Sequence, residues 1–176
     1  MFRVLLFFKI SLVILITNTA YSQPNISKTF TNLILHKTPR DLPLLQVENK
    51  DKKNVVLSDF SSKITLINFW ATWCAPCKKE IPKLDKLAEK AGSKQLKIIA
   101  INIEKKPYSD VKKFLDDLNV KNFDTVFDRK LQIAKTLGLR GIPITLVVNQ
   151  NSKEVARIIG DLDFERKEFV EWINSF

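Results

Sequence analysis

The stretch FWATWCAPCKKEIP, residues 69–82, contains both cysteines of this 176-residue chain. Cys74 and Cys77 are separated by two residues, and an apolar run that ends at Trp70 comes directly before them. After them, apolar residues recur every three or four positions until Gly92, which predicts a helix that stops there. The cysteine pair is therefore expected where a buried strand meets the N-terminus of a helix.

Three roles other than redox chemistry fit this pair poorly. A disulfide across two residues closes almost no loop, and the stabilisation that a cross-link gives grows with loop length. A structural zinc site needs four ligands, but the chain has no further cysteine and a single histidine, His36. Covalent haem attachment requires histidine directly after the second cysteine, where Lys78 stands. We therefore expect neither a metal nor a small-molecule cofactor.

A redox role agrees with the expected position of the pair. The N-terminus of a helix favours an anion, and a thiolate in a C-x-x-C pair is stabilised there. Cys74 lies at the mouth of the helix and is predicted to be the more exposed sulfur and the attacking nucleophile. Cys77 is predicted to resolve the mixed disulfide that this attack forms.

Glu80 follows Cys77 by three residues, so the two side chains are neighbours on a helix. A carboxylate there would repel a Cys77 thiolate, and it could accept the Cys77 proton when resolution begins. The alternative is an acid that only benefits from the helix dipole in the first turn. We therefore treat Glu80 as a candidate catalytic residue beside the two cysteines.

Hydrophobic periodicity predicts an α/β domain in which strands and helices alternate. A hairpin is expected from residues 42–47 and 54–60, and strands at 63–70, 96–103 and 123–128. Helices are expected at 108–119, with Ser109 as the cap, at 129–139 and at 163–176, and an antiparallel pair at 144–149 and 155–160. This order predicts a parallel centre of the sheet with antiparallel strands added at the end.

The N-terminal residues 1–22 are strongly apolar and end in small residues, which predicts a signal peptide cut after Ser22. An uncleaved membrane anchor formed by residues 4–20 is the alternative, although a spanning helix needs about 20 apolar residues. Either reading places the rest of the chain in the periplasm. Residues 23–41 show no clear period and are expected to be a tether, and residues 42–176 a single domain.

The chain is basic, with a formal net charge of +10. Its lysines are scattered, and neither a run of basic residues nor an aromatic-rich basic motif is present. We therefore expect a solvated lysine-rich surface and no nucleic-acid partner.

The motif NFWATWCAPCKKEIPKL, followed at residues 137–149 by LGLRGIPITLVVN, resembles the TlpA/ResA-like family of thiol–disulfide oxidoreductases. The resemblance implies a thioredoxin-like fold over residues 42–176, with a mixed central sheet flanked by helices and an N-terminal β-hairpin. It also implies a reductant that acts on disulfides of client proteins, such as apocytochrome c or copper-centre assembly factors. A membrane-linked thiol reductant would regenerate it.

The resemblance also implies further site residues. Pro143 matches the cis-proline that the family carries beside the cysteines, and the backbone of Ile142 could pair with an extended client segment. Trp73 would line the same client-binding surface. The family often has threonine directly after this proline, whereas here Ile144 intervenes before Thr145.

Two neighbouring groups of the same superfamily match less well. A peroxiredoxin would carry Thr or Ser three residues before its cysteine, where this chain has Ala71. A general thioredoxin has a buried aspartate in the strand before the motif, where this chain has Asn68. Glu104, at the end of the next strand, is either a substitute for that missing acid or an ordinary surface charge.

Two alternative functions stay open at this stage. The direction of electron flow depends on the reduction potential, which varies widely across this fold. The chain could therefore be an oxidant or isomerase of exported proteins. A redox-inert chaperone or metal carrier is the remaining alternative.

Overall fold

The computed structural model describes residues 26–57 and 62–176, so the predicted signal peptide or anchor lies outside the described residues. The strands are β1 (Leu33–Asp41), β2 (Gln46–Glu48), β3 (Asn54–Val56), β4 (Ile64–Trp70), β5 (Leu96–Asn102), β6 (Thr125–Phe127), β7 (Ile144–Asn149) and β8 (Lys153–Ile159). The helices are α1 (Ile26–Thr29), α2 (Ala75–Ala91), α3 (Tyr108–Asp117), α4 (Gln132–Thr136) and α5 (Lys167–Asn174). Together they form a thioredoxin-like fold with one mixed sheet, as the sequence predicts.

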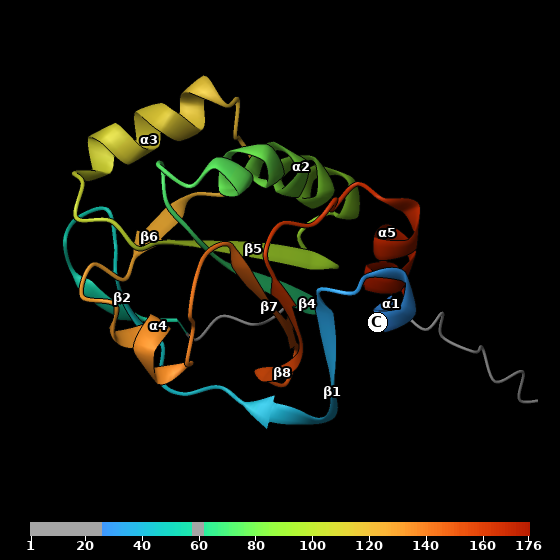
Figure 1. The fold of residues 1–176 in the computed structure, drawn as a ribbon. Coiled ribbons are helices and arrows are strands. Elements are labelled where there is room, and N and C mark those ends of the chain that lie inside the picture. The colour runs from blue at the N-terminus through green and yellow to red at the C-terminus, as the bar shows by residue number, and fades with distance from the viewer. Residues whose placement is uncertain (1–25, 58–61) are drawn as a thin grey trace, which may run out of the picture.

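The sheet has the strand order β1-β8-β7-β4-β5-β6-β2-β3. Strands β4, β5 and β6 run parallel to one another, while β7 pairs antiparallel with β4 and β8 antiparallel with β7. In Figure 1, α2 and α3 lie along one side of the sheet and α4 lies on the other. The predicted parallel centre with antiparallel additions is therefore confirmed.

All seven residues of β4 are buried, because helices cover both faces of this central strand. On one face, Leu66 belongs to the same apolar cluster as Leu84 of α2. On the other face, Ile67 and Phe69 cluster with Ile133 of α4. Strand β4 therefore has a fixed position, and its C-terminal end carries the cysteine motif.

Helix α2 begins directly after Cys74 and ends at Ala91. Gly92 follows with a φ of 74°, a left-handed conformation that favours glycine, and its N–H donates to the Ala88 carbonyl. The helix continues through Pro82. The predicted helix and its glycine stop are therefore confirmed.

The expectation that residues 23–41 form a tether is wrong for residues 26–41. Helix α1 buries Ile26, and β1 pairs antiparallel with β8, with Leu33 opposite Ile158. Local periodicity could not reveal β1, because it is an edge strand with mostly exposed side chains and a register shift. Its Pro39 is tolerated because an edge strand leaves one row of backbone N–H groups unpaired.

Three helix ends differ from the sequence prediction. Ser109 does not cap α3: the N-cap is Pro107, without a side-chain bond, and the Ser109 hydroxyl donates to Asp110. Helix α4 starts at Gln132 because Leu131 before it adopts a left-handed φ of 57°. Helix α5 starts at Lys167, four residues later than expected.

The predicted hairpin is present but short. Strand β2 pairs antiparallel with β3, from Gln46 opposite Val56 to Glu48 opposite Asn54. Asn49 closes the turn, because its side-chain oxygen accepts the N–H groups of Asp51 and Lys53. Residues 58–61, which include the end of the predicted second arm, lie outside the described residues.

Candidate active site

The two cysteines lie where β4 passes into α2, as predicted, and Figure 1 shows this junction. They form a disulfide, and Cys74 is the N-cap of α2. The Cys77 N–H donates to the Cys74 sulfur over 3.3 Å, and the Lys78 N–H donates to the Cys74 carbonyl over 3.1 Å. The Lys78 bond is the ordinary first bond of the helix, whereas the Cys77 N–H points at the sulfur itself, and a donor at a helix N-terminus stabilises a thiolate there.

Cys74 is 4% exposed and Cys77 is fully buried. Only Cys74 can therefore be reached from solvent without movement of the helix. The order of exposure agrees with the predicted roles of attacking and resolving sulfur, although the difference is small.

The loop before β7 contains the predicted cis-proline. The Ile142–Pro143 peptide bond is cis, and Pro143 is buried at the start of β7. Strand β7 is the antiparallel neighbour of β4, so this loop and the cysteine motif meet at the same edge of the sheet. The Gly160 N–H donates to the Pro143 carbonyl over 2.9 Å, which joins the loop to the end of β8.

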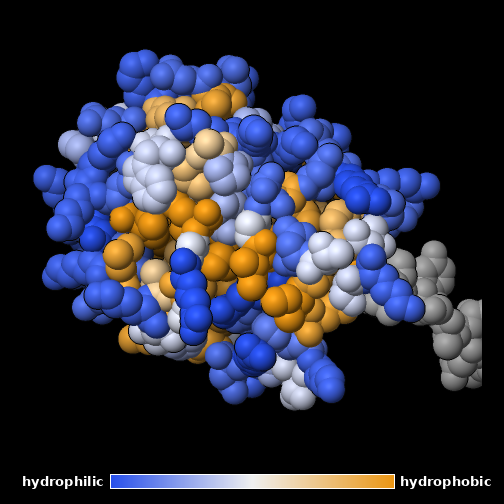
Figure 2. Space-filling model, in the orientation of Figure 1, coloured by the Kyte–Doolittle hydropathy of each residue, from blue (hydrophilic) through white to orange (hydrophobic). Residues whose placement is uncertain are grey.

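An apolar pocket of about 320 Å³ lies between the cysteine turn and this loop. Trp73 of the cysteine turn and Ile142 of the cis-proline loop both line it, and Trp73 is 65% exposed. The other lining residues are Phe69, Ile103, Leu131, Ala134, Leu139 and Gly141. Figure 2 shows apolar surface gathered on the face below the start of α2, among mostly polar surroundings.

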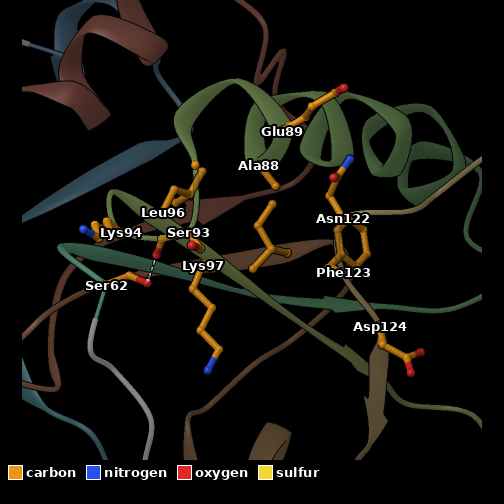
Figure 3. A pocket seen from close by; sticks show the side chains of 12 residues that line it. Ser62, Ala88, Glu89, Ser93, Lys94, Leu96, Lys97, Asn122, Phe123 and Asp124 are labelled. Atoms are coloured by element: carbon orange, nitrogen blue, oxygen red, sulfur yellow. Dashed lines mark hydrogen bonds between the residues drawn. The ribbon is translucent and has the colours of Figure 1, made fainter.

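A larger hollow of about 1,020 Å³ lies at the C-terminal end of α2, away from the cysteines (Figure 3). Its lining includes Ala88 and Gly92 of that helix end, and the Ser62 hydroxyl donates to the Ser93 carbonyl at its rim. The cysteines line neither pocket, but Trp73 of the cysteine turn lines the smaller one and no residue of that turn lines the larger one. The smaller pocket is therefore the one beside the cysteines.

Glu80 is 1% exposed and lies one helical turn after Cys77. Asn68 in β4 donates from Nδ2 to Glu80 Oε1 over 2.8 Å and to Thr145 Oγ1 in β7 over 2.9 Å. Burial raises the pKa of Glu80 to about 8, and the Asn68 hydrogen bond offsets only part of this effect. Near neutral pH the carboxyl is therefore mostly protonated, which suits a group that exchanges a proton with a neighbour.

Two buried oxygen atoms of this group, Asn68 Oδ1 and Glu80 Oε2, have no hydrogen-bond partner within the described protein. A neutral carboxyl tolerates such a site far better than a carboxylate does. The sequence signal for this network is the polar Asn68 within an otherwise apolar strand. Its contact with Thr145 was not predicted.

Glu104 is neither an exposed charge nor part of the Asn68 network. It is 7% exposed, and it accepts the backbone N–H of Thr72 over 2.6 Å and the Thr72 hydroxyl over 2.9 Å. The pKa of Glu104 is lowered: desolvation acts to raise it, but the hydrogen bonds from Thr72 and Asn102 outweigh that effect. The interpretation of Glu104 as an ordinary surface charge is therefore wrong.

Two further residues have structural surroundings that the sequence left open. Trp70 is fully buried and stacks on Phe114 at a ring distance of 5.8 Å, so it belongs to the core. His36 has a separate role: its Nε2 lies 2.9 Å from the Glu154 carboxylate, which also accepts a hydrogen bond from Arg157. His36 therefore joins edge strand β1 to β8 and lies outside the cysteine site.

The described residues contain no cluster of three or more His, Cys, Asp or Glu side chains that could hold a metal ion. Within residues 26–57 and 62–176, no helix has both the length and the apolarity that a membrane crossing requires.

The fold and the Cys74–Cys77 pair at a helix N-terminus are those of thioredoxin-like thiol–disulfide oxidoreductases. A family model described as Redoxin matches residues 24–171, and the chain belongs to this family. It is 31% identical over 129 residues to the thiol-disulfide oxidoreductase ResA of Bacillus thuringiensis subsp. konkukian, covering 73% of each chain. ResA of Bacillus subtilis is also 31% identical, over 69% of this chain and 67% of that protein. The chain is therefore a thiol–disulfide oxidoreductase.

Solved structures agree on the fold. A thiol:disulfide interchange protein described as DsbE from Chlorobium tepidum is similar with a TM-score of 0.68 and 25% identity, covering 79% of this chain and 96% of that one. StoA of Bacillus subtilis is similar with a TM-score of 0.59 and 23% identity, covering 76% of this chain and 98% of its own.

Proposed function

We propose that this protein is an exported reductant that reduces disulfides in selected client proteins. The observation that carries the direction is the environment of Cys77, which is fully buried and one helical turn from the buried acid Glu80. Burial disfavours a thiolate on Cys77, and the minor ionised form of Glu80 disfavours it further. A resolving thiol that is not stabilised as a thiolate shifts the pair toward the disulfide, so the pair gives up its electrons more readily.

The reaction has two thiol–disulfide exchange steps. The Cys74 thiolate attacks one sulfur of a client disulfide, which forms a mixed disulfide and releases one client thiolate. Cys77 then loses its proton to the ionised form of Glu80, which is the minor form near neutral pH because the pKa is about 8, and attacks the Cys74 sulfur. The second client thiolate leaves, the Cys74–Cys77 disulfide forms, and two electrons have passed to the client. A membrane-linked thiol reductant would return them.

The client segment is expected to bind in an extended form along Ile142 and Pro143, with an apolar side chain in the pocket beside Trp73. The wall formed by Trp73 and Ile142 supports this placement. Apocytochrome c and copper-centre assembly factors are clients of the family that the motif resembles, and we propose clients of this kind here.

The reduction potential tests the direction. Equilibration of the purified protein with glutathione buffers, followed by thiol counting, should give a potential well below about −180 mV, the range of isomerising and oxidising members. A more positive value would contradict a reductant and favour the oxidant or isomerase.

A trapping variant tests the exchange mechanism. Cys77→Ser should accumulate a mixed disulfide between Cys74 and its client, because no resolving sulfur is present. The matched control, Cys74→Ser, should trap far less, because the remaining sulfur is buried. Failure of Cys77→Ser to trap any client would favour the redox-inert alternative.

Export is proposed from residues 1–22, which the sequence predicts to be a signal peptide. N-terminal sequencing of the mature protein from the host should begin at Gln23. A mature protein that begins at residue 1 and fractionates with the membrane would favour the anchor formed by residues 4–20, and one that begins there in the cytosol would contradict export.

A further inference from the structure

The turn that joins β4 to α2, residues 71–74, is held by a buried carboxylate from another strand end. Glu104 follows the C-terminal end of β5, and its Oε2 accepts the Thr72 N–H over 2.6 Å. The Thr72 hydroxyl donates to Glu104 Oε1 over 2.9 Å and accepts from Lys106 Nζ over 2.7 Å. Both the backbone and the side chain of Thr72 are therefore bound to one acid.

Glu104 is itself anchored on several sides. Its carboxylate accepts from Asn102 Nδ2 over 3.1 Å, and its own N–H donates to Asn102 Oδ1 over 2.8 Å. Arg129 donates to the Glu104 carbonyl over 3.1 Å. Lys106 lies 3.6 Å from the carboxylate. A charge with this many donors is ionised and fixed in place, so it can act as a rigid support.

The supported turn carries the two groups that meet the client. Trp73 directly follows Thr72, and Cys74 comes next, with its N–H donating to the Ala71 carbonyl over 3.2 Å. Trp73 is 65% exposed, so few side-chain contacts fix it, and its position depends on its backbone. The bonds to Thr72 and Cys74 hold that backbone on both sides of the indole.

We propose that Glu104 is a positioning residue for disulfide exchange: by fixing Thr72 it aligns Trp73 and Cys74 with an extended client segment bound along Ile142. This inference rests on the proposed client binding, but it does not depend on the direction of electron flow. Loss of the clamp would leave the chemistry of the sulfur largely intact and would disturb the apolar wall beside it. The rate of disulfide exchange should therefore fall more with peptide disulfides than with small disulfides.

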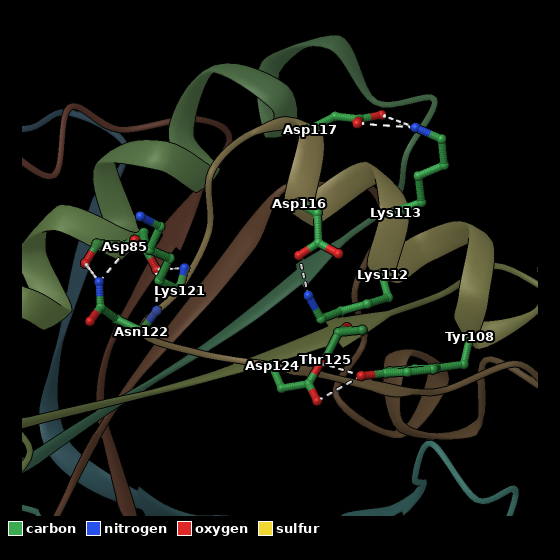
Figure 4. Close-up of polar contacts among 10 residues, drawn as sticks. All are labelled: Asp85, Tyr108, Lys112, Lys113, Asp116, Asp117, Lys121, Asn122, Asp124 and Thr125. Carbon is green, nitrogen blue, oxygen red and sulfur yellow. Dashed lines mark hydrogen bonds and ion pairs between the residues drawn. The ribbon is translucent and has the colours of Figure 1, made fainter.

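The test variant is Glu104→Gln, which keeps the size of the side chain but replaces one accepting oxygen with a donor. The matched control is Asp85→Asn. Asp85 is also 7% exposed, and it accepts the backbone N–H groups of Lys121 and Asn122 over 3.0 and 2.7 Å (Figure 4). It lies eight residues after Cys77 on α2, about 12 Å along the helix axis. Both variants therefore remove a buried carboxylate clamp, but only one clamp touches the cysteine turn.

Rates are measured for the reduced protein with two probes, hydroxyethyl disulfide and a short apolar peptide that contains a disulfide. For Glu104→Gln we expect kcat/KM with the peptide to fall about tenfold, mainly through KM, within the range that misplaced reacting groups cost. The rate with hydroxyethyl disulfide should change less than about threefold. Asp85→Asn should change neither rate at temperatures where both variants remain folded.

A milder variant covers the case in which Glu104→Gln does not fold. Thr72→Val removes the hydroxyl contacts with Glu104 and Lys106 but keeps the backbone bond to Glu104, and it should give a smaller loss of the same kind. Because Thr72 and Glu104 act as one unit, the double variant should lose no more than Glu104→Gln alone.

The proposal would be overturned if kcat/KM of Glu104→Gln fell equally with both probes or fell with neither. It would also be overturned if Asp85→Asn showed the same pattern as Glu104→Gln. A reduction potential in the oxidising range would overturn the proposed direction without changing the ratio of the two rates. The two failures are therefore distinguishable.

Discussion

Asn68 in β4 and Glu80 in α2 share a hydrogen bond of 2.8 Å that joins the central strand to the helix below the disulfide. The same Asn68 amide donates to Thr145, two residues after the cis-proline. One side chain therefore connects three segments of the site. Burial raises the pKa of the acid beside Cys77, and hydrogen bonds from the Asn68 amide and from the Leu162 backbone offset part of this rise.

Asn68→Leu tests this relationship. Loss of the amide donor removes an interaction that stabilises the carboxylate, so the pKa of Glu80 should rise above about 8. The unfolding free energy should fall by about 1–3 kcal/mol, since polar atoms of Glu80 and Thr145 lose their partner. Titration of the Glu80 carboxyl carbon by NMR measures the first effect. Thr145→Val leaves the Asn68–Glu80 bond in place and should leave that pKa nearly unchanged.

Glu80→Gln tests the pH dependence of stability. The pKa of Glu80 is about 8 in the folded protein and 4.5 without its surroundings, so between these values the native state holds a proton that the unfolded state lacks. Stability should therefore fall as pH rises through this window, by on the order of 5 kcal/mol in total at 1.36 kcal/mol per pKa unit. Urea unfolding at pH 5, 7 and 9 should show this decline in the wild type and its loss in Glu80→Gln. If the unfolding free energies of the two proteins changed with pH in parallel, Glu80 could not be a buried protonated acid.

Trp73→Ala tests the apolar wall. Because the side chain is 65% exposed, its removal should change the unfolding free energy by no more than about 0.5 kcal/mol. The rate with an apolar peptide disulfide should fall about tenfold, since a large aromatic contact is lost. Stopped-flow kinetics measures the rate, and Leu44→Ala, which removes another exposed apolar side chain outside the pocket, serves as the control. A similar loss in both variants would count against the pocket.

Glu154→Gln tests the network that joins β1 to β8. Desolvation acts to raise the pKa of Glu154, but hydrogen bonds from Arg157 and His36 outweigh it and the pKa is lowered. The carboxylate therefore contributes stability above its ordinary pKa of 4.5, and this contribution is lost as pH falls through the lower folded value. As pH falls, Glu154→Gln should lose less stability than the wild type, which acid unfolding followed by circular dichroism measures. Glu89→Gln, at an exposed position of α2, should give the same acid-unfolding curve as the wild type.

The central elements and the cysteine pair could be predicted from the sequence because their signals are local. The apolar run at β4, the helical spacing up to Gly92 and the two-residue gap between the cysteines each lie within a short window. Helix ends were less predictable. Helix α4 starts late, because Leu131 adopts a left-handed φ and Asp128 accepts the N–H groups of Gln132 and Ala134, and hydrophobic periodicity does not predict either feature.

The sequence by itself determined the redox pair and its place at a helix N-terminus, because both follow from neighbouring residues. The tertiary structure decided the rest of the site. Glu104 meets Thr72 across 32 residues, and Asn68 meets Thr145 across 77, through the register of strands that are adjacent only in the folded sheet. The tertiary structure also decided that residues 33–41 form an edge strand, since their pairing partner in β8 lies more than a hundred residues further along the chain. Contacts of this kind depend on which strands become neighbours, and a local pattern of residue types does not contain that information.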